Sequence, residues 1–151
     1  MNPLAENANQ YQPPKITVLM PVYNVSKFLP KCLQTLMDQT FRDFRLIAVN
    51  DGSTDNCLEI LRDFEARYHN ITVIDQPNRG MSMARNAALA LADSKYICFV
   101  DSDDYLAPTF LQELYQAITI HDADIACCYY YYCFYYNKNN FKYFTLFVSP
   151  N

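Results

Sequence analysis

Residues 44–55 read FRLIAVNDGSTD, an apolar run that turns polar and leads into a helical pattern. The short apolar run predicts a buried strand over residues 44–50. Gly52 supplies a turn, and Ser53, Thr54 and Asp55 are residue types that cap helices. An apolar stripe with helical spacing follows, at Cys57, Leu61, Phe64 and Tyr68. The stretch therefore predicts a strand, a polar turn and a helix in succession.

The same alternation of strand and helix patterns extends in both directions along the chain. Further buried strands are predicted at 16–20, 71–74, 96–100 and 125–128. Helices are predicted from Ser26, over 81–92 and from Pro108 onward. Apolar strands alternating with amphipathic helices predict an α/β fold with a mostly parallel sheet and helices on both faces. In such sheets, ligands bind at the carboxyl ends of the strands.

Most of the chain is expected to form one domain. Its 151 residues suffice for one domain with a core and are too few for two ordinary ones. Residues 1–14 are predicted to be a polar leader, and residues 15–126 the folded domain. Residues 127–151 form an aromatic-rich tail that follows neither strand nor helix periodicity.

Charge and composition exclude several classes of protein. The net charge of −4 argues against a general binder of nucleic acid or acidic membranes. No stretch reaches the roughly 20 apolar residues that span a bilayer, and no signal segment is recognised, so a cytoplasmic protein is expected. The six cysteines show no metal-ligand spacing, which favours reduced thiols over zinc. With only two glycines, the chain cannot contain the G-x-G-x-x-G dinucleotide motif.

Polar residues follow the first two predicted strands. Pro21 is expected to end strand pairing, so that Tyr23 and Asn24 project at the carboxyl edge, where a flat base can stack on the aromatic ring. The alternative is an ordinary turn with a packed tyrosine. Asp51 and Ser53 follow the next strand, where the carboxylate can accept from a base or sugar and the helix start can bind phosphate. The alternative is a turn with a helix cap.

Charged residues gather after the later strands. Asp101, Asp103 and Asp104 repel one another unless a cation or hydrogen-bond donors compensate, and their oxygens suit a hard divalent cation that also binds substrate phosphate. The alternative is an acidic loop with a helix cap. Arg79 and Arg85 supply positive charge nearby in the sequence. Arg85 opposes the dipole of its predicted helix, which indicates a specific partner, either a diphosphate or a carboxylate. The alternative is a pair of surface arginines.

Taken together, these motifs resemble those of the family 2 glycosyltransferases over roughly residues 15–126. The resemblance implies a GT-A (Rossmann-like) fold, a nucleotide-sugar donor that is most often UDP-linked, and a Mn²⁺ or Mg²⁺ ion. It places Pro21, Tyr23 and Asn24 around the base and ribose, Asp51 on the uracil edge with Ser53 beside it, and Arg79 and Arg85 near the nucleotide. Asp101 and Asp103 match the family's D-x-D element, which touches ribose and metal, and Asp104 shares the metal role.

The resemblance also implies a function. It is the inverting, metal-dependent transfer of a sugar from a UDP-sugar to a saccharide or lipid-linked saccharide acceptor, in surface polysaccharide or lipopolysaccharide synthesis. Peripheral association with the inner face of the cytoplasmic membrane would accompany it. Such a displacement needs a general base for the acceptor hydroxyl. No acidic residue follows Asp124, so no base is assigned. A truncated nucleotide- and metal-binding module, weak or inactive in catalysis, is the alternative function.

Overall fold

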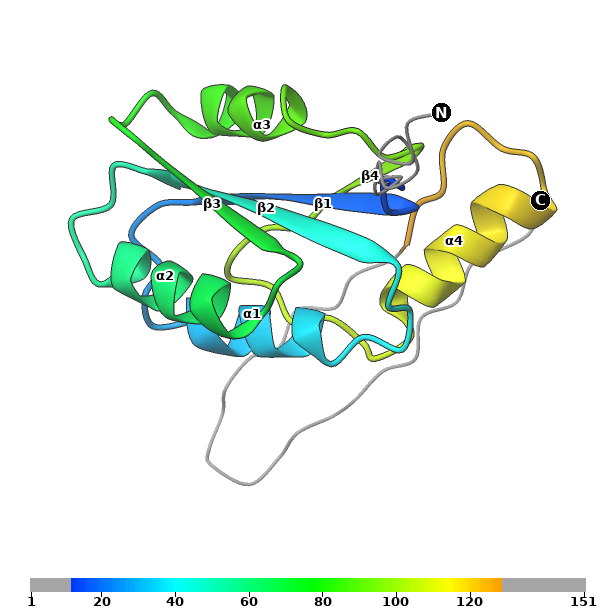
Figure 1. The fold of residues 1–151 in the computed structure, drawn as a ribbon, viewed down its shortest axis with the longest axis horizontal. Coiled ribbons are helices and arrows are strands. Elements are labelled where there is room, and N and C mark those ends of the chain that lie inside the picture. Colours follow the sequence, from blue (N-terminus) through cyan, green and yellow to red (C-terminus); the bar gives the residue numbers. More distant parts are fainter. Residues whose placement is uncertain (1–11, 129–151) are drawn as a thin grey trace, which may run out of the picture. The chain divides into compact units, whose positions relative to one another are not determined.

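The computed structural model describes residues 12–128, which form strands and helices in strict alternation (Figure 1). The strands form one four-stranded parallel sheet with the order β3-β2-β1-β4. In chain order the elements are β1 (Ile16–Val22), α1 (Leu29–Met37), β2 (Phe44–Asp51), α2 (Cys57–Arg67), β3 (Ile71–Gln76), α3 (Met81–Leu89), β4 (Tyr96–Phe99) and α4 (Phe110–Ile120). The predicted α/β fold with a parallel sheet is confirmed.

The described residues fall into two compact units. The first comprises residues 12–26 and 43–102, and contains the whole sheet together with α2 and α3. The second comprises residues 27–42 and 103–128, and contains α1 and α4.

The central strands of the first unit are β1 and β2. Nearly every residue of both strands is buried, which explains why they read as continuous apolar runs in the sequence. They pair in parallel from Ile16 opposite Phe44 to Val22 opposite Asn50. The outer strands β3 and β4 instead alternate between more and less buried positions. Helices α2 and α3 lie on opposite faces of the sheet (Figure 1), so the first unit confirms helices on both faces.

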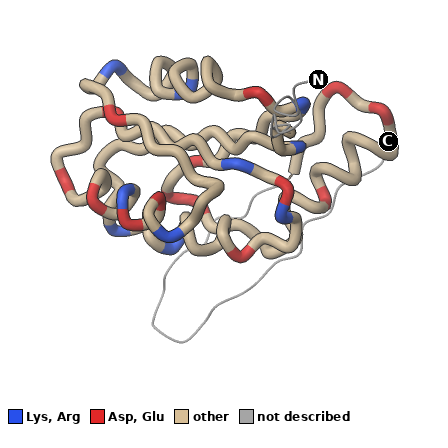
Figure 2. Tube along the Cα trace, in the orientation of Figure 1, with Lys and Arg blue, Asp and Glu red and all other residues tan. Residues whose placement is uncertain are grey.

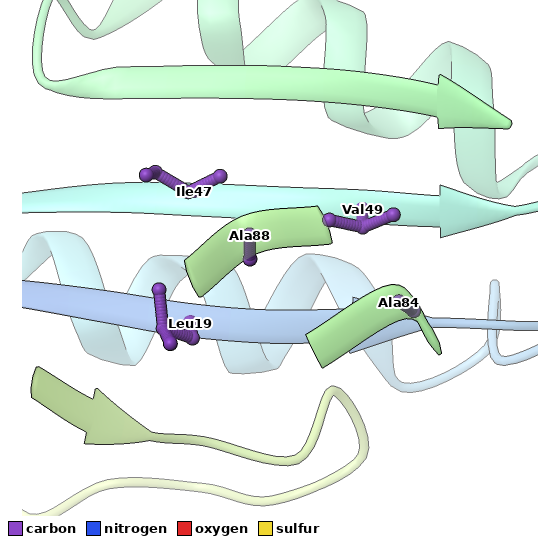
Figure 3. Close-up of a cluster of buried hydrophobic side chains, with 5 residues drawn as sticks. All are labelled: Leu19, Ile47, Val49, Ala84 and Ala88. Carbon is purple, nitrogen blue, oxygen red and sulfur yellow. The ribbon is translucent and has the colours of Figure 1, made fainter. Parts of the chain in front are cut away.

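Small residues bring α3 close to the sheet. Ala84 and Ala88, one helical turn apart, pack on Leu19 of β1 and on Ile47 and Val49 of β2, and all five side chains are buried (Figure 3). Methyl side chains let the helix lie near the strands without overfilling the space between them. Because α3 follows β3 directly in the chain, its N-terminus lies at the carboxyl edge of the sheet.

The expectation that Pro21 ends strand pairing is wrong. β1 continues to Val22, and Pro21 lies opposite Val49 of β2. The carbonyl of Leu19 accepts a hydrogen bond from the backbone N–H of Val100, so the polar groups of Leu19 face the β4 side. Pro21, two residues later, faces the same side beyond the last residue of β4. Its missing N–H therefore costs no ladder hydrogen bond.

Two helices begin later than the sequence patterns predict. Helix α1 has Phe28 as its N-cap residue rather than Ser26, and Pro30 lies in its first turn, where no N–H is needed. The backbone N–H of Ser26 instead donates to Asp55. Helix α4 has Thr109 as its N-cap residue, so Pro108 precedes the helix and does not open it. Helix α3 ends at Leu89, before the predicted residue 92.

The predicted strand at 125–128 is absent. These residues adopt no strand conformation, and the side chain of Ile125 is 77% exposed. An apolar run becomes a strand only where a neighbouring strand satisfies its backbone, and none of the described strands pairs with this segment. Most of the predicted leader and the tail from residue 129 onward lie outside the described residues.

In the second unit, a buried glutamine that follows α1 connects this helix to the start of α4 by hydrogen bonds. Gln39 is fully buried, and its Nε2 donates to the carbonyls of Ala107 (2.7 Å) and Thr35 (3.1 Å). Its Oε1 accepts from the backbone N–H of Leu111 (2.9 Å). Leu111 lies in the first turn of α4, where N–H groups have no partner inside the helix. Gln39 therefore caps α4 from a distant part of the sequence.

Replacing Gln39 with leucine should lower the free energy of unfolding by about 1–3 kcal/mol, because one backbone N–H and two carbonyls lose their hydrogen bonds to this side chain. Urea denaturation measures the change. Gln34→Leu is the matched control in the same helix, since Gln34 makes only an exposed hydrogen bond to Asp38. It should change stability by less than about 0.5 kcal/mol. Equal effects of the two substitutions would contradict the capping role of Gln39.

Candidate functional site

The order of the strands locates the edge at which open α/β sheets commonly bind ligands. The chain runs from β1 to β2 and β3 on one side, and then crosses to β4 on the other side of β1. The gap between β1 and β4 is thus the switch point where open α/β sheets bind ligands, at the carboxyl ends of the strands. Tyr23 follows β1, Asp51 ends β2 and Asp101 follows β4. The parallel sheet therefore gathers these residues at one edge.

The carboxylate of Asp51 organises the loop between β3 and α3. Its Oδ1 accepts from Nε2 of Gln76 (2.7 Å) and from the backbone N–H of Arg79 (2.9 Å), and its Oδ2 accepts from the N–H of Gly80 (2.8 Å). Burial alone would raise the pKa of Asp51, but these hydrogen bonds outweigh it and hold the pKa below its usual value. Asp51 is therefore ionised and fixed in place.

Both glycines of the chain lie in this region. Gly52 has a φ of +68°, and a Cβ atom at this position would lie 2.5 Å from the backbone nitrogen of Asn78. Only a glycine allows the β2–α2 and β3–α3 loops to approach so closely. Gly80 has a φ of +87° and forms the N-cap of α3, where its own geometry rather than crowding requires glycine. Both turns therefore adopt backbone conformations that favour glycine.

The loop after β1 is bound to the loop after β2. Asn24 adopts a left-handed conformation with a φ of 51°, and its Oδ1 accepts from the backbone N–H of Thr54 (2.8 Å). Its own N–H donates to Oγ of Ser53 (3.1 Å). Asn24 and Ser53, both expected to contact the nucleotide, therefore also fix the loop that carries Tyr23. Tyr23 as a whole residue is 49% exposed, which is compatible with stacking on its ring.

Asp55 is a positioning residue that the sequence analysis treated only as a helix cap. One carboxylate oxygen accepts from the backbone N–H of Ser26 (2.9 Å) and the other from the N–H of Cys57 at the start of α2 (3.1 Å). Burial opposes ionisation, but hydrogen bonds from Cys57 and Ser26 lower the pKa of Asp55 to about 2. Burial and the Asp55 carboxylate raise the pKa of the Cys57 thiol to about 11, so this thiol stays protonated.

Arg85 pairs with a carboxylate, one of the two partners that the sequence indicated. Its Nη2 lies 2.7 Å from Oδ1 of Asp101, and the guanidinium carbon lies 5.7 Å from the centre of the Phe99 ring. The Nε of Arg85 is buried and has no hydrogen-bond partner among the described residues. Arg79 contributes its backbone N–H to the Asp51 network, and its side chain is exposed.

Asp103 and Asp104 belong to the second unit, and both are exposed. Within the described residues, no group of three or more His, Cys, Asp or Glu side chains is arranged to hold a metal ion by itself. Carboxylates nevertheless have the hard oxygen donors that Mg²⁺ and Mn²⁺ prefer, and such ions are commonly held by one or two carboxylates together with substrate phosphates. The donor chemistry of these aspartates therefore suits a cation that is shared with a phosphorylated substrate.

Charges of both signs are interspersed along the described chain (Figure 2). The tube shows no extended basic stretch of the kind that follows a nucleic-acid backbone. None of the described helices combines the length and apolar character that crossing a membrane requires.

Comparison with known proteins assigns the family. The model of the family described as glycosyl transferase family 2 matches residues 17–148. The chain belongs to this family. Its sequence is 45% identical over 112 residues to the glycosyltransferase GlyA of Streptococcus pneumoniae, a match that covers 74% of this chain and 16% of GlyA. It is 37% identical over 115 residues to the poly(ribitol-phosphate) beta-glucosyltransferase of Bacillus spizizenii, covering 74% of this chain and 18% of that enzyme.

The structural comparison agrees with the family assignment. The fold matches TarS from S. aureus, crystallised in complex with UDP, with a TM-score of 0.68 and 33% sequence identity. The match covers 73% of this family 2 chain and 33% of the TarS chain. The predicted GT-A fold is thereby confirmed. The chain spans only about a sixth of the two curated relatives and a third of the TarS structure.

Replacing Asp55 with asparagine should lower the free energy of unfolding by about 1–3 kcal/mol at pH 7, because two hydrogen bonds to an ionised acceptor are weakened. A carboxylate whose pKa falls from 3.8 to about 2 on folding stabilises the fold above pH 4 and loses this effect as the pH falls towards 2. The difference between wild type and variant should therefore narrow between about pH 4 and pH 2 in chemical denaturation. A difference independent of pH would refute this role.

Proposed function

We propose that this family 2 chain is the donor-binding part of a glycosyltransferase that uses a nucleotide diphosphate sugar, with UDP as the nucleotide. The acceptor is a saccharide or lipid-linked saccharide in surface polysaccharide or lipopolysaccharide synthesis, and the transfer is inverting. The observation that carries this proposal is the gathering of Tyr23, Asp51 and Asp101 at the carboxyl ends of adjacent parallel strands. The UDP bound to TarS, a structural relative at 33% identity, supports UDP as the nucleotide.

The nucleoside is proposed to bind over the loops that follow β1 and β2. Tyr23 offers an exposed ring for the base, and Pro21 and Asn24 frame the base and ribose. A carboxylate provides about four acceptor positions, and three protein donors bind Asp51 among the described residues. Its remaining capacity suits the ring N–H of uracil. Ser53 lies beside this position, and Arg79, held through its backbone by Asp51, places a cation next to the nucleotide.

The diphosphate is proposed to bind near the segment 101–104. Asp101, Asp103 and Asp104 would hold Mn²⁺ or Mg²⁺, a proposal that rests on their donor chemistry and their spacing in the sequence. When bound, the cation supplies charge neutralisation for the departing diphosphate. Arg85, already next to Asp101, can donate to the phosphate oxygens. The proposed location is the cytoplasm, with peripheral attachment at the inner face of the membrane where lipid-linked acceptors lie.

The chain should bind UDP more tightly with Mn²⁺ than with a chelator, and Asp103→Ala should remove most of this gain, about tenfold or more in Kd. The reason is that removing one oxygen ligand leaves the cation held mainly by phosphate. Isothermal titration calorimetry measures both affinities. Asp63→Ala is the control, because Asp63 makes a surface ion pair with Arg67 on α2. Equal UDP affinity with Mn²⁺ and with chelator would contradict the metal-dependent function.

Asp51→Asn should weaken UDP binding by about 1–3 kcal/mol, because an amide replaces the charged acceptor for the base N–H. Pyrophosphate with Mn²⁺, which has no base, should bind with unchanged affinity, and this comparison separates base recognition from general loss of the site. Gln76→Leu keeps the carboxylate while removing one of its supporting hydrogen bonds, and should have a smaller effect. If Asp51→Asn leaves the affinity for UDP unchanged, Asp51 serves only the loop structure.

A further inference from the structure

The Arg85–Asp101 pair joins two elements at the switch point of the sheet. Arg85 is the middle residue of α3, and Asp101 follows β4. Their side chains are 31% and 53% exposed, and the atoms that pair lie 2.7 Å apart. The ion pair therefore connects the middle of α3 to the carboxyl end of β4.

The environment of Arg85 leaves part of its hydrogen-bonding capacity unused. Its Nε–H is buried and has no partner among the described residues, although a buried donor without a partner destabilises a protein. The guanidinium also lies near the face of Phe99, which restricts where it can move. A planar guanidinium can bind two oxygens of a phosphate at once, whereas here Nη2 of Arg85 donates to one oxygen of Asp101.

The pair is also weak enough to be exchanged. Partly exposed ion pairs contribute little net stability, because water screens them and solvates the separated charges well. Each member has a stronger partner among the proposed ligands: a diphosphate for the guanidinium, and a divalent cation for the carboxylate. Arrival of both ligands therefore replaces one weak pair by two stronger ones.

We propose that Arg85 is the internal counter-ion of Asp101, and that exchange of this pair makes binding of the divalent cation and of the donor diphosphate interdependent. The proposal rests on the proposed function and adds a coupling role for one residue. Without nucleotide, the guanidinium occupies Oδ1 of Asp101 and repels a dication, so the cation alone binds weakly. A diphosphate draws the guanidinium onto its own oxygens and releases Asp101. By linkage, each ligand strengthens the other by the same factor.

The decisive experiment compares Arg85→Gln with wild type in two titrations of the 151-residue chain, Mn²⁺ alone and UDP at saturating Mn²⁺. We expect Mn²⁺ alone to bind about threefold to tenfold more tightly to the variant, as the loss of a competing ion pair implies. We expect UDP to bind about tenfold or more weakly, as the loss of a charge-assisted hydrogen bond implies. Damage to the structure would weaken binding of both Mn²⁺ and UDP. A rise in the affinity for Mn²⁺ together with a fall in the affinity for UDP therefore identifies the exchange.

Three further variants sharpen the test. Arg67→Gln removes the same charge from another 2.7 Å ion pair, with Asp63 on α2, and should change neither titration. Arg85→Lys keeps the charge but not the planar fork, so its affinity for Mn²⁺ alone should stay within about twofold of wild type while UDP binds more weakly. In an Asp101→Asn background, Arg85→Gln should no longer increase the affinity for Mn²⁺, because the carboxylate for which the guanidinium and the cation compete is absent.

The outcomes distinguish this inference from the proposed function. If wild type binds UDP equally well with and without Mn²⁺, the proposed metal-dependent function fails. If wild type shows the metal dependence but Arg85→Gln leaves the coupling between Mn²⁺ and UDP unchanged, the function stands and the exchange is refuted. A parallel loss of both affinities in Arg85→Gln, with Arg85→Lys behaving alike, also overturns the exchange and assigns Arg85 a structural role.

Discussion

The hydrogen bonds accepted by the Asp51 carboxylate connect the end of β2 to the end of β3 and the start of α3. Without them the loop that carries Arg79 and Gly80 would have no fixed relation to the sheet, because its backbone N–H groups point at this one side chain. Gly52 makes the contact possible by letting the neighbouring loops approach to a distance that no Cβ atom tolerates. Together with the packing of Ala84 and Ala88 on the sheet, this constraint positions α3 and with it Arg85.

Several residues at the edge of the sheet for which a binding role is proposed also have structural roles. Asn24 and Ser53 hydrogen-bond each other's loops, and Asp55 holds the same two loops through backbone N–H groups. A loop supported in this way holds the backbone next to Tyr23 before any ligand arrives, which lowers the ordering cost of binding. A structural role and a ligand-binding role of the same side chain are therefore compatible. Separate measurements of the binding of base, phosphate and metal distinguish the two roles.

Each of three acidic side chains at this edge of the sheet has a hydrogen-bond or ion-pair partner. Asp51 and Asp55 are both held ionised by side-chain and backbone hydrogen-bond donors, and Asp101 is paired with Arg85. Hydrogen bonds of this kind favour the charged form of a carboxylate and so offset the cost of its burial. Arg85, unlike the donors to Asp51 and Asp55, is also proposed to bind the diphosphate. Exchange of partners is therefore proposed at Asp101 and not at Asp51 or Asp55.

The sequence by itself determined the fold class and the family, since apolar periodicity and motifs such as Asn50–Asp55 are local properties of the chain. It also indicated that Arg85 needs a specific partner. Only the tertiary structure decided which carboxylate that partner is, that Pro21 stays within β1, and that Gln39 caps α4. Each of these depends on which distant backbone or side-chain group lies opposite, and a local pattern carries no such information. A proline ends pairing only if its missing N–H faces a partner strand, and a glutamine becomes a cap only when folding brings a helix start to it.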